Sequence, residues 1–402
     1  MSQMDVLLIS QRDAWQAVLR EAGGYDTYHL PEYHAVAEAA GEGAAHLFVY
    51  RESGYTIALP LLLRSLDGVA GISENCTGLL DATSVYGYGG PIGSQDPLPP
   101  GFIRGFQSAL SAQLRERRVI TVFSRLHPLL PHQAALVGLG ECPVLWRTVS
   151  IDLTLPLEAQ RAGYRKNHRE GVSKLIRKSL TCVHDSDWRY FDVFQEIYAE
   201  TMRHVEASPS YYFSAEYFTR LRDTLGAHVH LFEVLHENRP VCAALMFESQ
   251  GILQYHLSGT SGSARKLAPM KLLLDGVREW GTRRGLRVFH LGGGMTARPD
   301  DPLFHFKLGF SDRTHDFAIW RWIIEPDVYR TLCEARAAWN SKHGLCATSA
   351  NFFPRYRCPV GPQARTAERA AAGQEAAAAG AGPSWSYSST ITLRALAAMQ
   401  LC

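Results

Sequence analysis

The chain has 402 residues, of which 46% are hydrophobic and 20% are charged. This apolar content is enough to build hydrophobic cores, so a disordered chain is excluded, and the length predicts two or three domains at roughly 150 residues each. Lysine and arginine number 41 against 39 acidic residues, a net charge of +2, so the whole chain carries no basic field for a nucleic acid and any such contact must come from a local patch.

The first 150 residues alternate helical and strand patterns, as expected of a mixed α/β domain. Apolar residues spaced near 3.6 predict helices, and alternating or short apolar runs predict strands. A segment rich in glycine and tyrosine, 84–94, interrupts these patterns. The predicted helices are 13–22, 32–40 and 101–115, and the predicted strands are 46–51, 55–63, 119–123 and 148–153.

The second half begins with a basic helix expected over 158–179. Two helices, three antiparallel strands, a polar loop, a helix ended by Gly285 and one more strand follow. This order of elements is typical of the acyltransferase fold called GNAT. The predicted helices are 188–205, 215–225 and 269–284, and the predicted strands are 230–236, 241–249, 251–258 and 288–291.

The fold class predicted from these elements is α/β, with two tandem GNAT-like domains built on mixed, mostly antiparallel sheets. The first domain is expected over 1–155 and the second over 156–312. Residues 313–360 are expected to return, as a strand and the start of a helix, and to pack on the N-terminal domain. The tail 361–402 is rich in alanine, so we expect it to be disordered.

Metal sites and membrane segments are not expected. The eight cysteines include no C-x2-C pair, and the sixteen histidines show no metal-ligand spacing. No apolar run approaches the ~20 residues that span a bilayer, and the N-terminus has no signal-peptide pattern. We therefore expect a cytoplasmic protein with reduced thiols and no integral membrane segment.

Two short motifs are candidates for chemistry. Gly292, Gly293 and Gly294 follow a predicted strand, where glycine lets a ligand or a neighbouring strand approach the backbone; a mobile loop is the alternative. Lys307 lies in an apolar and aromatic run, where a buried ammonium group needs an anion or a developing negative charge. A lysine that reaches solvent from the surface is the alternative. For His256 and His290 we expect ordinary structural roles.

The basic helix is the third candidate. From Arg161 to Lys178 it carries seven Lys or Arg residues and one acid, Glu170. Such a stripe holds phosphates and makes binding salt-dependent, while a solvated helix face is the alternative interpretation. The predicted tRNA- or phosphate-binding residues are Arg165, Lys166, Arg169, Lys174, Arg177 and Lys178, with Arg265 and Lys266 from the loop before the central helix.

Together these motifs resemble the Fem aminoacyltransferases, which are two GNAT-type domains in tandem. The resemblance covers about residues 25–325, and its closing signature is the most specific part. The matching motifs are Y-G-Y-G-G-P at 86–91, R-K-N-x-R at 165–169, Y-x-L-S-G-T at 255–260, and L-G-G-G with D-x-L-F-x-F-K-x-G-F at 291–294 and 301–310.

The resemblance implies an enzyme that moves an amino acid from aminoacyl-tRNA to an amine and so forms an amide bond. It gives Lys307 a role toward the activated donor and places Phe306 beside the terminal adenosine of the tRNA. No general base, metal or cofactor is assigned. The acceptor is expected in a cleft between the domains, near Tyr86, Tyr88, Tyr255, Gly292, Gly293 and Gly294.

The acceptor and the donor have alternatives. Residues 30–35 lack the lysine that cell-wall members use, so an intermediate of a peptide-like natural product is as suitable an acceptor as a peptidoglycan precursor. The alternative activity is acyl-CoA-dependent N-acyltransfer, which uses a Q/R-x-x-G-x-G/A loop to hold pyrophosphate at a helix N-terminus. The loop 260–269 has Arg265 and Lys266 but no G-x-G/A in the right place. A catalytically inactive binding module is the third alternative.

Overall fold

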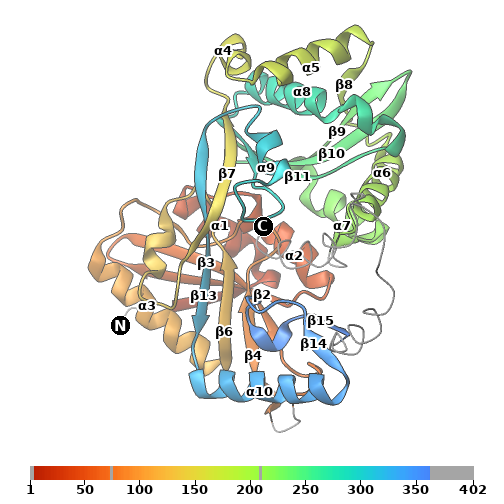
Figure 1. The fold of residues 1–402 in the computed structure, drawn as a ribbon. Helices are drawn as coiled ribbons and strands as arrows, with labels where there is room; N and C mark the ends of the chain where they lie inside the picture. The colour runs from red at the N-terminus through yellow and green to blue at the C-terminus, as the bar shows by residue number, and fades with distance from the viewer. Residues whose placement is uncertain (1–3, 73–75, 208–210, 363–402) are drawn as a thin grey trace, which may run out of the picture.

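The computed structural model describes residues 4–72, 76–207 and 211–362. In these residues a 13-stranded mixed sheet runs through the whole molecule, in the order β1-β2-β3-β4-β6-β13-β7-β12-β11-β10-β9-β8, with β5 paired to β3. Helices cover both of its faces (Figure 1). A separate hairpin pairs β14 with β15.

The first half contains the predicted helices and strands together with three short strands that the sequence patterns did not predict. These are β1, β4 and β5, which have few residues in which an alternation can be recognised. The elements are β1 (Met4–Leu8), α1 (Arg12–Ala22), α2 (Pro31–Ala39), β2 (Ala44–Glu52), β3 (Tyr55–Ser65), β4 (Leu80–Thr83), β5 (Ile92–Gly93), α3 (Pro100–Glu116), β6 (Val119–Arg125) and β7 (Val144–Asp152).

The second half confirms the predicted order of helices and strands, with two unpredicted elements, the edge strand β8 and the short helix α9. The elements are α4 (Leu157–Ala162), α5 (Lys166–Arg177), β8 (Thr181–His184), α6 (Phe191–His204), α7 (Ala215–Leu225), β9 (Val229–His236), β10 (Arg239–Ser249), β11 (Ile252–Thr260), α8 (Met270–Arg283), β12 (Val288–Gly292) and α9 (Pro302–Lys307).

The prediction of a single basic helix over 158–179 is wrong in one respect, because the structure has two helices there. The chain breaks between α4 and α5 at 163–165. The guanidinium of Arg169 donates hydrogen bonds to the carbonyl oxygens of Ala162 and Tyr164, so it satisfies acceptors at the break. The periodic pattern continues through the break, which is why the sequence alone suggested one helix.

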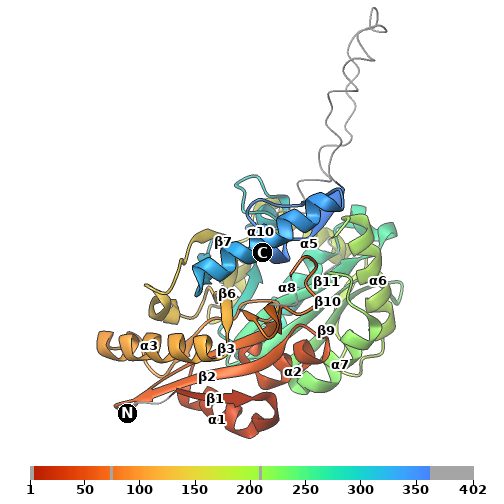
Figure 2. The ribbon, with the colours of Figure 1, turned by 90° about the horizontal axis from the view of Figure 1, so that it is seen from below.

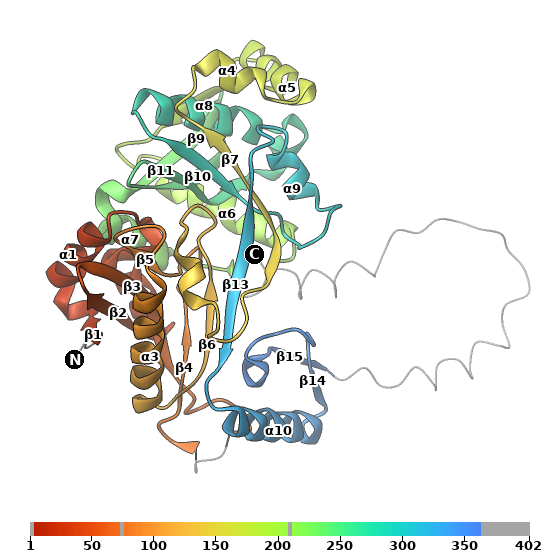
Figure 3. The same ribbon diagram turned by 90° about the vertical axis from the view of Figure 1, so that its left-hand side faces the viewer.

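Two strands join the halves of the sheet. β13 (Thr314–Ile323) pairs with β6 through Ile319–Ile323 and with β7 through Thr314–Ala318, so one strand belongs to both halves. Figure 3 shows β13 running from the half that contains α8 to the half that contains α3 and α10. β7 in turn pairs with β12. The backbone hydrogen-bond ladder therefore crosses between the halves without interruption.

The hydrophobic cores also join the halves. One core gathers α1, α2, α6 and α7 against the sheet, with Trp15, Tyr28 and Leu47 from the first half and Phe194 and Phe247 from the second. These four helices lie along one side of the sheet (Figure 2). α3 builds a second core with β2 and β3, and α5, α8 and α9 build a third with strands of the second half.

After β13 the chain forms α10 (Pro326–Lys342), β14 (Leu345–Ala347) and β15 (Val360–Pro362). Leu332 of α10 and Tyr356 are buried with Ile120 of β6 in a small core. The Tyr356 hydroxyl lies 2.8 Å from Oγ1 of Thr121. Residues 361 and 362, the first two of the predicted tail, instead pair in β15, and the rest of the tail, from residue 363 onward, lies outside the described residues.

Candidate active site

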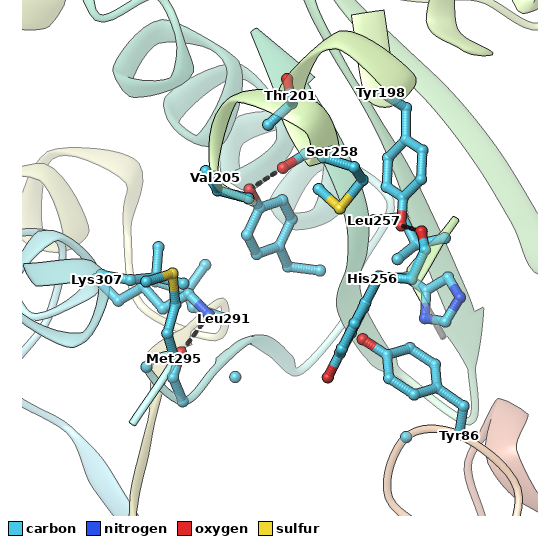
Figure 4. Close-up of a pocket in the computed structure, with 18 of the residues that line it drawn as sticks. Tyr86, Tyr198, Thr201, Val205, His256, Leu257, Ser258, Leu291, Met295 and Lys307 are labelled. Atoms are coloured by element: carbon cyan, nitrogen blue, oxygen red, sulfur yellow. Dashed lines mark hydrogen bonds between the residues drawn. The ribbon is translucent and has the colours of Figure 1, made fainter. Parts of the chain in front are cut away.

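A cavity of about 340 Å³ opens where β11 and β12 separate. The two strands pair in parallel at three positions, the last being Gln254 with His290. Beyond this pair they diverge, and the cavity lies between 255–258 of one and 291–294 of the other, with α6 and the tyrosine-rich loop of the first half closing it (Figure 4). Splayed parallel strands supply a concave site without breaking the rest of the sheet.

Lys307 projects into this cavity from α9. Its residue is 6% exposed, and its Nζ donates a hydrogen bond to the carbonyl oxygen of Gly293 at 2.5 Å. The same Nζ lies 5.4 Å from the centre of the Tyr255 ring. α9 is anchored by Asp301, which caps it by accepting from the amide of Phe304 at 2.8 Å. The ammonium group is thus held beside both an aromatic face and the turn formed by Gly292, Gly293 and Gly294, called the glycine turn below.

The glycine turn approaches these side chains closely. Gly292 has φ +74°, and a Cβ there would lie 3.1 Å from the Tyr88 hydroxyl and 3.4 Å from Nζ of Lys307. At Gly294 a Cβ would overlap the carboxylate of Asp301. Glycine is therefore required by the conformation at Gly292 and by the space at Gly294.

Tyrosines form most of the remaining wall. The ring centre of Tyr86 lies 5.8 Å from that of Tyr211, and the ring of Tyr88 meets that of His290 edge-on at 5.0 Å. Tyr255 is hydrogen-bonded to the Oγ of Ser258. Burial raises the pKa of Tyr255 to about 12, so its hydroxyl stays protonated at neutral pH. The wall therefore offers an apolar surface with neutral hydroxyl donors.

His256 also lines the cavity, where the sequence indicated an ordinary structural histidine. Its ring stacks on Phe247 with centres 3.9 Å apart, and burial lowers its pKa to about 3. A histidine held neutral in this way behaves as an aromatic wall residue. The structural expectation for His256 is thus compatible with its place beside the cavity.

A buried polar network, which sequence reasoning missed, lies behind this wall. Asp26, His127, Gln254 and His290 are all 3% exposed or less. The side chains of His127 and Gln254 both bond to Oδ2 of Asp26, at 2.9 and 2.6 Å, and Oε1 of Gln254 bonds to Nδ1 of His290 at 2.7 Å. No local motif links these residues, because two lie in loops of the first half and two on strands of the second.

The hydrogen-bond pattern assigns the proton positions in this network. The amide of Leu129 donates to Nδ1 of His127, so Nε2 of that ring carries the hydrogen toward Asp26. Gln254 uses its amide group on Asp26, so its oxygen accepts from Nδ1 of His290. The remaining nitrogen of His290, Nε2, is a buried acceptor without a hydrogen-bond partner in the described residues. Burial lowers the pKa of His290 well below its usual value.

Phe306 faces away from the cavity, toward the basic helix. Its ring centre lies 5.3 Å from that of His168 on α5, and its carbonyl oxygen accepts from Nε2 of His168 at 3.0 Å. Gly309 packs against the same histidine, and a Cβ there would overlap the His168 ring. α9 therefore contacts the cavity through Lys307 and the basic helix through Phe306.

The predicted phosphate-binding cations lie on a different surface from the cavity residues. All six on α5 and at its two ends are exposed, whereas Arg265 is half-buried and pairs with Glu200 at 3.4 Å; Lys266 is exposed. Lys166 lies 3.8 Å from Glu170, and Arg169 is used at the helix break. α4, α5 and α8 lie together at one end of the molecule (Figure 1). The structure thus brings together Lys307, the three tyrosines and the three glycines, and leaves Phe306 and the cations outside the cavity.

Residues 4–72, 76–207 and 211–362 contain neither a cluster of metal ligands nor a helix that could span a membrane. No group of three or more His, Cys, Asp or Glu side chains in these ranges is arranged to hold a metal ion. No helix in these ranges has both the length and the apolar character required to cross a membrane.

Comparison with known proteins gives a family match for the second half. Residues 160–307 match the model of the acetyltransferase (GNAT) domain. No curated protein matches the chain. The crystal structure of FemX is similar over 81% of this chain and 99% of its own, with a TM-score of 0.63 and 12% identity. L-PGS from Bacillus licheniformis is similar over 78% of this chain and 92% of its own, with a TM-score of 0.50 and 15% identity.

These similarities confirm the predicted fold class, an α/β chain of the tandem GNAT type. The domain match covers β11, β12 and α9, and therefore the strands and helix that carry the glycine turn and Lys307. Residues 160–307 therefore form an acyltransferase domain of the GNAT type.

Proposed function

We propose that this acyltransferase moves an aminoacyl group from aminoacyl-tRNA to the amine of an acceptor bound in the cavity. The observation that carries the proposal is the position of α9, with Lys307 in the cavity and Phe306 against the exposed basic helix α5. A long polyanionic donor needs cations outside the cavity and a reactive end inside it. α9 lies between two surfaces that meet these needs.

The reaction needs an acceptor amine that loses a proton, a donor group that stabilises an oxyanion, and a proton for the ribose leaving group. The amine attacks the ester carbonyl, a C–N bond forms, and the bond to the ribose oxygen breaks, while the amine loses a proton and the leaving oxygen gains one. The tetrahedral intermediate carries an oxyanion, and one well-placed donor is worth about 2–4 kcal/mol to it. Lys307 is the cationic donor that faces the cavity, and the hydroxyl of Tyr88 lies beside the same Gly292 backbone.

The loop before α8 gives less support to acyl-CoA as donor. The amide of Gly262 donates to Oε1 of Glu200 at 2.9 Å, and Arg265 pairs with the same carboxylate. The amide of Lys271 bonds to the carbonyl oxygen of Ala268, and Pro269 has no amide hydrogen. A carboxylate of the chain itself therefore uses donors that pyrophosphate requires at this helix N-terminus.

The acceptor remains a choice between two classes, an intermediate of a peptide-like natural product and a peptidoglycan precursor. Both present a primary amine on a peptide-like body, which suits a cavity walled by tyrosines. The reaction needs no cofactor beyond the charged tRNA, and a cytoplasmic location, where charged tRNA is made, goes with the proposal.

The test compares donors directly. Purified protein and a cell extract as acceptor source receive either tRNA charged with radiolabelled amino acids or labelled acetyl-CoA, each with and without RNase. We expect RNase-sensitive transfer from charged tRNA, and the label identifies the amino acid. RNase-resistant transfer from acetyl-CoA would replace the proposal with the acyl-CoA alternative. Transfer from neither donor, in an extract shown to contain the acceptor, would favour a binding module.

A further inference from the structure

A second cavity, of about 570 Å³, adjoins the first. Tyr86 and Tyr211 line both cavities, so these two side chains form a shared wall. The rest of the second cavity comes from β3, β4, β6 and β13, from residues 349–357 of the segment after α10, and from loop residues that include Glu42 and Phe213. It is therefore a separate space that borders the candidate active site.

Four arginines line this second cavity, and three have carboxylate partners. Arg64 and Arg357 both pair with the buried Asp81, and Arg321 pairs with Glu141 at 3.1 Å. Because one carboxylate balances two guanidinium groups, the cluster around Asp81 retains a positive charge. These three arginines are held in place by the fold itself.

Arg125 differs from the other three. It has no ion pair with any described residue, and its Nε is buried without a hydrogen-bond partner. Its guanidinium carbon lies 5.6 Å from the centre of the Phe123 ring. A half-buried guanidinium that forms no ion pair loses hydration without a direct contact to an anion, which is an unfavourable arrangement unless a ligand supplies that contact.

One acid, Glu42, also lines this cavity, but it forms no ion pair with Arg125. Burial raises the pKa of Glu42, and the charges of Arg125 and Arg64 oppose this rise from beyond ion-pair distance. The remaining wall is rich in aromatic side chains, including Phe213, Phe352 and Phe353. A ligand that fits here has an anionic group for the guanidinium and an uncharged body for the aromatic wall.

We propose that the second cavity binds an anionic group of the acceptor, a carboxylate or a phosphate, through the guanidinium of Arg125. This extends the function proposed above, because the shared wall of Tyr86 and Tyr211 lets one acceptor place its anion in the second cavity and its amine near Lys307. The acceptor is thus a molecule with an amine at one end and an acidic group at some distance from it.

Binding of small anions tests this site without any donor. Purified full-length protein is titrated with succinate and, separately, with pyrophosphate, at ionic strength matched with potassium chloride, and affinity is measured by calorimetry. We expect saturable binding of one probe, weakened about tenfold or more in Arg125→Gln. Arg104→Gln, which removes an exposed cation from α3, should bind like the unmodified protein. Succinate binding indicates a carboxylate, and pyrophosphate binding indicates a phosphate.

Two results would overturn the site: no binding of either probe, or equal binding by Arg125→Gln and the unmodified protein. Circular dichroism shows whether Arg125→Gln folds. If Arg125→Gln does not fold, Arg125→Lys replaces it; this variant keeps the charge but loses the planar fork, so it should bind with intermediate affinity. Failure of the donor test with intact anion binding would remove the tRNA proposal alone. Loss of anion binding with intact transfer from tRNA would remove this site alone.

Discussion

Gln254 and His290 are the last cross-strand pair of β11 and β12, and their side chains are hydrogen-bonded at 2.7 Å where the strands begin to diverge. The amide of Gln254 also donates to Asp26, which lies in the first half of the chain. The side chain of Gln254 therefore connects the point where β11 and β12 diverge to the first half of the chain. The shape of the cavity depends on a contact between residues 228 positions apart.

Replacing Gln254 with leucine should destabilise the protein by about 2–3 kcal/mol, because it leaves buried polar atoms of Asp26 and His290 without this partner. Urea denaturation measures the change in the free energy of unfolding. Gln95→Leu, in an exposed loop, is the matched control and should stay within about 0.5 kcal/mol. A change at Gln254 as small as that of the control would mean that the network does not contribute to stability.

Lys307→Met should lower the rate of transfer about 10²–10³-fold with little change in donor binding, because it removes the cation beside the reacting carbonyl and keeps the side-chain volume. Single-turnover kinetics with charged tRNA separate the chemical step from binding. Lys342→Met, on the exposed face of α10, should have no effect. Unchanged turnover in a folded Lys307→Met protein would contradict the role of this lysine.

Charge removal at the end of α5 should act on tRNA binding instead. The double variant Arg177→Gln, Lys178→Gln should raise the KM for charged tRNA and reduce the slope of log affinity against log salt by about 1–2, since fewer phosphates are neutralised and fewer counterions are released. The rate at saturating tRNA should be kept. Arg20→Gln, Arg104→Gln removes two exposed cations from the first half and serves as control. Equal salt slopes in the two variants would assign α5 to solvated surface.

The buried carboxyl group of Glu233 should make the free energy of unfolding depend on pH. Both its carboxylate oxygens are buried without a partner, and burial raises its pKa to about 8. The folded state holds this proton while the unfolded state, with its ordinary pKa of 4.5, has lost it, so the contribution of Glu233 to stability is greatest below pH 4.5 and falls up to about pH 8. The fall is at most about 1.4 kcal/mol for each pH unit in this window.

Glu233→Gln removes the titrating group, so its advantage over the unmodified protein should grow from pH 5 to pH 8 and then level off. Urea midpoints at pH 5, 6.5 and 8 measure this difference. Glu237→Gln, in the exposed turn after β9, should show a constant difference. A Glu233→Gln curve parallel to that of the unmodified protein would indicate that Glu233 ionises normally in the fold.

Most of the helices and strands could be predicted from the sequence because they bury one face and so repeat apolar residues at a regular spacing. β4, β5 and β8 could not, since strands of four residues or fewer hold too few repeats. Lys307 and the glycine turn were recognisable because each is a local motif. Asp26 and His127 were not, because their pairing with Gln254 exists only after the halves pack together.

Arg125 is another residue whose importance could not be predicted from the sequence. An arginine at the end of a strand has no distinctive sequence pattern, and its importance appears only when the neighbouring arginines are seen to have carboxylates and it does not. Lack of a charge partner is a property of three-dimensional packing. Sequence patterns therefore indicated the cavity that contains Lys307 better than the cavity that contains Arg125.

The place of β13 has a consequence for synthesis on the ribosome. β6 is complete at residue 125, yet its partner β13 ends at Ile323, so about 200 further residues must be translated before the two can pair. At 5–20 residues per second, β6 then waits roughly 10–40 seconds with one edge unpaired. Chaperones that shield nascent chains have this interval in which to act, and expression at low temperature, which lengthens it, should make their presence matter more.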